Sequence, residues 1–188
     1  MIYRDSGIIT CASMELPLHP VIVHFPVALT IFFLFVYPAL ILWMGSHPDR
    51  QKTFVLVPSL ALVLILLSYG ALFTGEQDEE LVEKVVPHEI IEEHEHAAQY
   101  FFYFSWVPFL IGLAGIKPWK GRQAARWLTV LSQVVLVFLL LDAAHKGGKL
   151  VYEHGAARAH YEKSERTTEP DNAENGDEKT EAIRGADH

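Results

Sequence analysis

Four long apolar stretches constrain the fold of this chain more than any other feature. They cover residues 23–44, 54–73, 97–116 and 127–144. An α-helix rises 1.5 Å per residue, so about 20 apolar residues cross the roughly 30 Å hydrocarbon core of a bilayer. Each stretch is apolar on all sides, whereas a helix on the surface of a soluble bundle keeps a charged face. The sequence therefore predicts an all-α integral membrane protein, an antiparallel four-helix bundle embedded in the lipid bilayer.

Composition supports this fold class and excludes several functions. Of the 188 residues, 51% are hydrophobic and 20% are charged, and the mean hydropathy is +0.19. A net charge of −8 argues against nucleic-acid binding, which requires clustered Lys and Arg. A single Cys excludes a disulfide framework and a Cys-rich metal centre. No GxSxG or HExxH motif of a hydrolase occurs, so at most we expect a redox subunit of a larger membrane complex.

The spans divide the chain into three parts. Residues 1–17 form an N-terminal lead-in, residues 18–157 a four-span membrane domain, and residues 158–188 a polar, acidic tail that we expect to be disordered. Either Met1 or Met14 could be the true start. Prolines within the spans are expected to kink the helices without ending them, whereas Gly147 and Gly148 are expected to break the last helix. The residue types show no internal repeat beyond the spans.

The charges of the connections predict the orientation of the spans. The first and third connections carry basic residues, namely Arg50, Lys52, Lys117, Lys120, Arg122 and Arg126. The second connection holds nine acidic residues and only Lys84. Because basic loops stay in the cytoplasm, the first and third connections should face it, with both termini outside the cytoplasm.

Histidines gather on the predicted outer side. Seven of the ten lie there on the four-span map: His19, His24, His88, His94, His96, His145 and His154. Neutral imidazole is a good ligand for heme iron, copper or zinc. We expect His24 and His145 as the first ligands, because each lies about one helical turn inside an apolar boundary. Next come His19, His94 and His154; since His94 and His96 are about 200° apart on a helix, only one of them can point inward.

Three polar side chains near these histidines could hydrogen-bond a ligating imidazole: Asp142, Asp78 and Thr74. Asp142 precedes His145 by three residues and so shares its helical face. Two alternatives stay open. The histidines could lie at the headgroup level without any ligand, and Asp142 could pair locally.

Several of these residues fall in motifs that resemble a known family. The opening Leu18–Leu29 (LHPVIVHFPVAL), Thr74-Gly75 with Asp78, His94, and the closing His145–Gly155 (HKGGKLVYEHG) are similar to blocks of the bacterial four-span family "domain of unknown function 2231". The resemblance covers residues 18–157 and implies a multi-pass protein of the bacterial inner membrane. Some relatives carry fused Rieske or cytochrome c modules, which implies membrane redox chemistry. This chain contains neither module, so such a redox partner would be a separate protein.

Two functional hypotheses follow from the histidines and the resemblance. The first is a b-type heme-binding subunit that passes electrons between a quinone pool and an extracytoplasmic acceptor. The second is a non-enzymatic membrane protein that binds copper or zinc, or an assembly or structural subunit without a cofactor.

Overall fold

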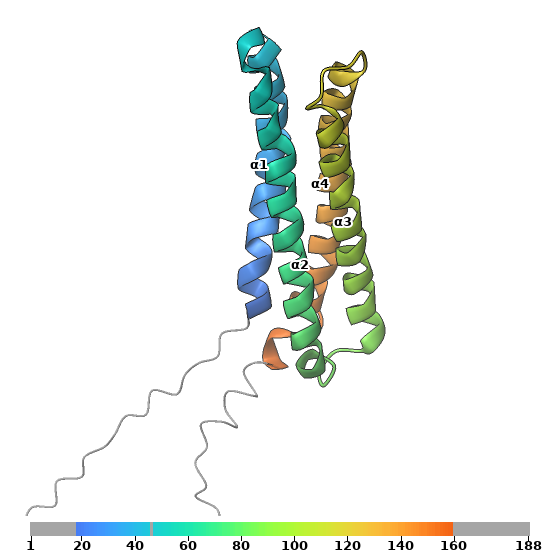
Figure 1. Ribbon diagram of the computed structural model, residues 1–188. Helices are drawn as coiled ribbons and strands as arrows, with labels where there is room; N and C mark the ends of the chain where they lie inside the picture. The colour runs from blue at the N-terminus through green and yellow to red at the C-terminus, as the bar shows by residue number, and fades with distance from the viewer. Residues whose placement is uncertain (1–17, 46, 160–188) are drawn as a thin grey trace, which may run out of the picture.

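The computed structural model describes residues 18–45 and 47–159, which form four long helices. These are α1 (Leu18–Gly45), α2 (Leu56–Val82), α3 (His88–Ala114) and α4 (Arg122–Tyr152), with the 3₁₀-helix η1 (Pro48–Val55) between α1 and α2 (Figure 1). All four are long and apolar enough to cross a membrane. The predicted all-α four-helix bundle is therefore confirmed, whereas the lead-in and the tail from residue 160 onward lie outside the described residues.

The helices alternate in direction, so the start of α1, the α2–α3 connection and the end of α4 share one end of the bundle (Figure 1). Helix α1 packs against α2 and α4, and α3 packs against the same two helices, which places α1 and α3 on a diagonal. The core is built from apolar side chains such as Phe33, Tyr37, Leu64 and Leu136. Polar side chains in the core bond mainly to main-chain carbonyls, as Thr30 does to Pro26 at 2.7 Å.

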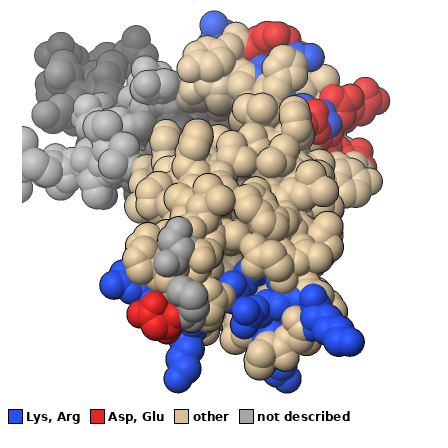
Figure 2. Space-filling model, turned by 90° about the horizontal axis from the view of Figure 1, so that it is seen from above, with Lys and Arg blue, Asp and Glu red and all other residues tan. Residues whose placement is uncertain are grey.

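The outer surface of the bundle is apolar where it would meet lipid. Large hydrophobic residues on all four helices are exposed, among them Phe35, Leu66, Leu110 and Phe138. Figure 2, which views the bundle from above, shows uncharged residues over most of the visible surface, with Lys, Arg, Asp and Glu side chains near its edges. The basic first and third connections lie at the opposite end of the bundle from the acidic second connection (Figure 1), and an apolar surface between two charged ends is what a bilayer requires.

Prolines and glycines act differently in the four helices. Pro26 and Pro38 lie inside α1 and Pro108 lies inside α3, so these prolines do not end their helices, as expected. The prediction that Gly147 and Gly148 break the last helix is wrong, because α4 continues to Tyr152. The chain turns only at Gly155, where φ is 71°. Small residues are common inside membrane helices because they allow a neighbour to approach closely, and Gly147 has that role below.

The two helical hairpins, α1–α2 and α3–α4, repeat one another. The buried residues 26, 30, 33 and 37 of α1 correspond to buried residues 101, 105, 108 and 112 of α3, each 75 positions later. In the same way, buried residues 57, 61, 64 and 71 of α2 correspond to 129, 133, 136 and 143 of α4, each 72 positions later. Few of these pairs keep the same residue type, so residue identity alone does not reveal this shared pattern. The two hairpins thus bury residues at matching positions.

A buried arginine holds the other end of the bundle together. The side chain of Arg126, at the start of α4, is only 2% exposed. Its Nε donates to the carbonyl of Gly115 at 3.1 Å, and its Nη1 donates to Oε1 of Gln51 at 2.6 Å. The guanidinium also lies over the ring of Phe54, 4.5 Å from its centre. Arg126 therefore links α4, the end of α3 and η1.

We expect Arg126→Ala to lower the free energy of unfolding by about 2–3 kcal/mol, because the carbonyl of Gly115 and the amide of Gln51 lose a charged donor inside the protein. Thermal unfolding in mild detergent, followed by circular dichroism, measures the loss. Arg122→Ala is the matched control, since Arg122 lies one turn earlier on α4 and is only half-buried. Equal melting temperatures for the two variants would contradict the role given to Arg126.

Candidate functional site

His19, the second residue of α1, turns its imidazole toward α2. Its Nδ1 lies 2.8 Å from the main-chain carbonyl of Ala71. Because a carbonyl can only accept, Nδ1 carries the proton and donates it, which leaves Nε2 of the neutral ring free as an acceptor or metal ligand. The hydroxyl of Thr74 lies 3.5 Å from the same Nδ1 and donates to carbonyls of its own helix.

His94 makes the equivalent contact in the second hairpin. It lies near the start of α3, is half-buried, and its Nδ1 donates to the carbonyl of Ala143 on α4 at 3.1 Å. The pair His19 and His94 is separated by 75 positions, and the pair Ala71 and Ala143 by 72 positions. These are the same offsets that relate the buried cores of the two hairpins. The two histidine contacts therefore occupy matching positions in the two hairpins.

A glycine on the facing helix makes room for each ring. A Cβ placed on Gly75 would lie 3.2 Å from Cε1 of His19, and a Cβ placed on Gly147 would lie 2.9 Å from Cε1 of His94. Each glycine follows its alanine by four residues, one turn along the same helix face. The Ala-x-x-x-Gly segments 71–75 and 143–147 thus cradle the two imidazoles.

The two rings face each other across the diagonal of the bundle. Their centres are 6.5 Å apart and their planes are nearly perpendicular, at 81°. Within the described residues, no third His, Cys, Asp or Glu converges on this pair as a group of potential ligands. The arrangement therefore offers two imidazole nitrogens from two helices at one depth, close to the end of the bundle that carries the α2–α3 connection.

The other histidines proposed as ligands lie outside this pair. His24 and His145 are both exposed, so the expectation that they project into the bundle is not met. Nδ1 of His24 contacts the carbonyl of Pro20 on its own helix. His154 is half-buried after the end of α4. His96 is exposed and His94 is half-buried, as their angular separation predicts.

The three polar neighbours also separate. Thr74 lies beside His19, as described above. Asp142 is exposed and pairs with Lys146, with Oδ2 and Nζ 2.9 Å apart, which is the local alternative considered for it. Asp78 is half-buried on α2, and the structure gives it no hydrogen bond to a histidine.

Sequence reasoning ranked His24 and His145 first because it used only depth along each span. The missed signal was the spacing of small residues at the ends of the second and fourth spans, where Ala71 and Gly75 match Ala143 and Gly147. A large ring on a neighbouring helix needs such a gap. In the structure, the ring that packs against the first of these segments is that of His19, and the ring that packs against the second is that of His94.

The fold and this site define a four-helix integral membrane protein with a symmetric histidine pair at one end. The chain belongs to the family described as predicted membrane protein (DUF2231), which matches residues 15–160. No curated protein and no solved structure matches the chain.

Alanine at either cradle glycine tests the packing of the pair. We expect Gly147→Ala to lower the free energy of unfolding by about 1–3 kcal/mol, because the added methyl group overlaps the His94 ring. Gly75→Ala should cost less, since the His19 ring is further away. Thermal unfolding in detergent measures both.

Two other helical glycines serve as controls. A Cβ at Gly70 or Gly148 would meet nothing within 4 Å. Alanine at these positions should be neutral or should stabilise the helix by up to about 1 kcal/mol. If Gly148→Ala destabilised the protein as much as Gly147→Ala, the cradle would not be the reason.

Proposed function

We propose that this protein binds heme b between His19 and His94 and acts as an electron-transfer subunit in the membrane. The observation that carries the proposal is the distance of 6.5 Å between the two ring centres. In addition, Nδ1 of each ring donates a hydrogen bond to a main-chain carbonyl, which leaves Nε2 available. Both features suit a pair of axial ligands on a single iron.

The two imidazoles are close enough to share one metal ion. Their ring centres are 6.5 Å apart, and Nε2 of each ring is free to coordinate an ion, as imidazole nitrogens do at about 2.0–2.1 Å. His19 and His94 would therefore hold the iron of a bound heme.

The number of protein ligands favours heme over zinc. Structural zinc takes four protein ligands and catalytic zinc takes three, whereas a heme brings four nitrogens of its own and needs only two axial ligands. Among the described residues, the pair supplies only those two. Zinc would need a further ligand at this place, and no third His, Cys, Asp or Glu of the described helices joins the pair.

The residues of this chain have distinct tasks in the proposal. The carbonyls of Ala71 and Ala143 fix the tautomer and orientation of the two rings. Gly75 and Gly147 let the rings lie close to the facing helices. Heme supplies one-electron chemistry when it is bound, and the apolar helices around it provide the low dielectric that tunes its potential.

Quinol is the proposed electron donor, and a separate Rieske or cytochrome c protein the proposed acceptor. An open groove between α2 and α3 has aromatic walls that include Tyr69, Phe73 and Tyr103, and its polar groups come from Glu76 and Gln99. Glu76 follows Gly75, where an added Cβ would lie 3.2 Å from Cε1 of His19. A carboxylate and an amide beside aromatic rings suit a quinol head group that must release protons as it gives up electrons.

Absorption spectra test the proposal. The protein expressed with abundant heme and purified in mild detergent should carry one heme per chain, with the reduced-minus-oxidised spectrum of a low-spin b-type cytochrome. His19→Gly and His94→Gly should each abolish this low-spin spectrum, because one axial ligand is lost. Added imidazole should restore it, since it can fill the space left by the missing ring.

The exposed histidines provide the controls. His24→Gly and His145→Gly should keep the wild-type spectrum, because neither side chain faces the pair. Loss of heme in these two variants, with retention in His19→Gly and His94→Gly, would identify His24 and His145 as the ligands instead. A wild-type protein without a Soret band would end the heme proposal.

We also propose that the protein lies in the bacterial inner membrane with the histidine pair on the extracytoplasmic side. The η1 end of the bundle carries the basic connections and the other end carries the acidic one, and basic loops remain in the cytoplasm. The end of α4 adds Lys146 and Lys149 to the acidic side, but Lys146 is paired with Asp142.

Cysteine labelling in intact cells should report this orientation. In a Cys11→Ser background, Glu92→Cys should react with a membrane-impermeant maleimide, whereas Lys120→Cys should react only after the cells are permeabilised. Both positions are exposed and lie at opposite ends of the bundle. The reverse labelling pattern would invert the topology.

A further inference from the structure

The α2–α3 connection brings a second group of metal-ligating side chains together, outside the histidine pair. We propose that Glu79, Glu83 and His88 bind a divalent transition-metal ion, with Zn²⁺ as the natural choice. Glu79 lies in the last turn of α2, Glu83 directly follows that helix, and His88 is the first residue of α3. The proposal does not depend on heme, because none of the three residues belongs to the His19–His94 pair.

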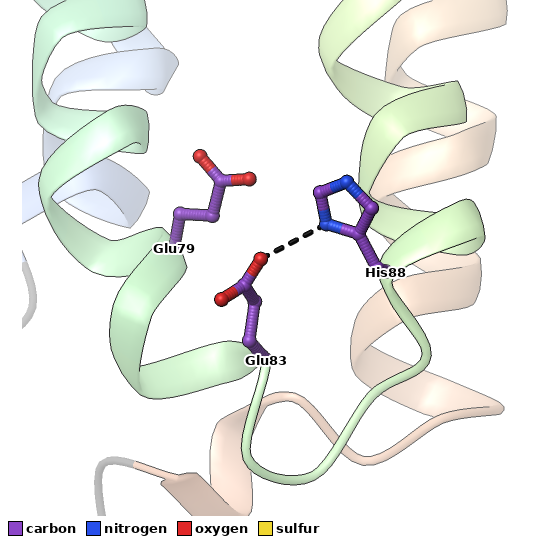
Figure 3. A group of neighbouring side chains, drawn as sticks. All are labelled: Glu79, Glu83 and His88. Atoms are coloured by element: carbon purple, nitrogen blue, oxygen red, sulfur yellow. Dashed lines mark hydrogen bonds and ion pairs between the residues drawn. The ribbon is translucent and has the colours of Figure 1, made fainter.

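The three side chains converge from two helices. One ligand atom of each lies within 4.8 Å of the others, and Nδ1 of His88 is 2.9 Å from Oε1 of Glu83. Figure 3 shows the carboxylates of Glu79 and Glu83 and the imidazole of His88 turned toward a common space across the connection. Ligand atoms of a tetrahedral zinc site lie about 3.3 Å apart, so small side-chain rotations are enough to close the group around an ion.

The main chain around this group is held in place. Val86, in the middle of the connection, is only 2% exposed and belongs to a small apolar cluster with Ile91, Leu150 and Ala156. This cluster ties the connection to α3 and to the end of α4. The positions of Glu83 and His88 on either side of Val86 are therefore fixed by packing, and a fixed ligand set loses less entropy when an ion binds.

Charge also favours a cation here. Within the described part of the chain, no Lys or Arg nitrogen lies within 4.0 Å of the carboxylates of Glu79 or Glu83. The whole segment 76–96 has nine acidic residues and only Lys84. The two neighbouring carboxylates have only the His88 imidazole beside them and repel each other, and a divalent ion between them removes that repulsion.

The donor types select the class of metal. Two carboxylate oxygens and one imidazole nitrogen suit Zn²⁺ and similar first-row ions, whereas Ca²⁺ and Mg²⁺ prefer oxygen alone. Three protein ligands leave at least one coordination position for water. A bound ion would link the end of α2 to the start of α3 and so restrain the connection between them.

Titration of the whole detergent-solubilised protein with Zn²⁺ tests the site. The protein should carry a non-histidine affinity tag, and isothermal titration calorimetry should show one saturable site per chain. His88→Ala and Glu83→Gln should each raise the Kd at least about tenfold, because even changes behind a ligand weaken metal sites by that factor. Both residues are exposed, so these variants should keep the circular dichroism spectrum of the wild type.

A second exposed pair provides the matched control. Nε2 of His96 lies 3.8 Å from Oε1 of Glu92. Among the described residues, no second carboxylate joins these two side chains as a potential ligand. His96→Ala should leave the zinc affinity unchanged. Equal affinities for wild type, His88→Ala and Glu83→Gln, an equal loss in His96→Ala, or no saturable binding by the wild type would each overturn the proposal.

Two further measurements separate this site from the heme proposal. His88→Ala should keep the heme spectrum of the wild type, and His19→Gly should keep its zinc affinity. Co²⁺ should bind in place of Zn²⁺ and give visible d–d absorption bands that disappear in His88→Ala; unchanged bands in that variant would exclude His88 as a ligand. Failure of the heme test leaves the zinc titration interpretable, and the reverse also holds.

Discussion

The hydrocarbon core of a bilayer offers no hydrogen-bond partner to the main chain, and the rest of this structure follows from that constraint. It makes each span a continuous helix, and most polar side chains in the spans return a hydrogen bond to their own helix, as Ser68 does to Leu64. Bonds between helices are therefore selective. Tyr37 donates to the carbonyl of Val57, and Gln133 donates to the carbonyl of Thr30. The two half-buried imidazoles donate to the carbonyls of Ala71 and Ala143. The histidine contacts thus belong to the small set of polar bonds that join one helix to another.

The fold could be predicted because apolar length and charge placement are local properties of the sequence. Four stretches long enough to span the bilayer gave four helices. Most helix ends extend beyond the apolar stretch, as α2 does to Val82, but α2 begins two residues after the predicted start and α3 ends two residues before the predicted end. The helical conformation at Gly147 could not be predicted from the neighbouring sequence alone. Helix propensity alone favours a break at two adjacent glycines, but the contact with His94 on another helix gives Gly147 a packing role inside α4.

The site was only partly predictable for the same reason. His19 and His94 were among the expected ligands, but depth along the span could not rank them above His24 and His145, since depth says nothing about the direction of a side chain. The direction of each imidazole depends on the neighbouring helix, which must offer a hydrogen-bond acceptor and space for the ring. The acceptor carbonyls of Ala71 and Ala143 lie 52 and 49 positions from their histidines in the sequence, so local sequence does not reveal them. The matching positions of the two hairpins are hard to recognise in the sequence, because most of their residue types differ. Leu64 and Leu136 are identical, whereas Ala61 in α2 corresponds to Gln133 in α4.

The matching burial patterns of the two hairpins place His19 and His94 in similar surroundings on opposite sides of the bundle. A ligand bound by both rings would lie between the two hairpins and contact the same element from each. The surroundings of the two rings nevertheless differ. Thr74 in α2 places a neutral hydroxyl beside His19, whereas the position 72 residues later in α4 is Lys146, whose ammonium group bonds to Asp142. A positive charge near one ring and a neutral dipole near the other make the two sides of the pair electrostatically unequal. The two rings therefore share the same kind of main-chain partner, while the charges around them differ from one hairpin to the other.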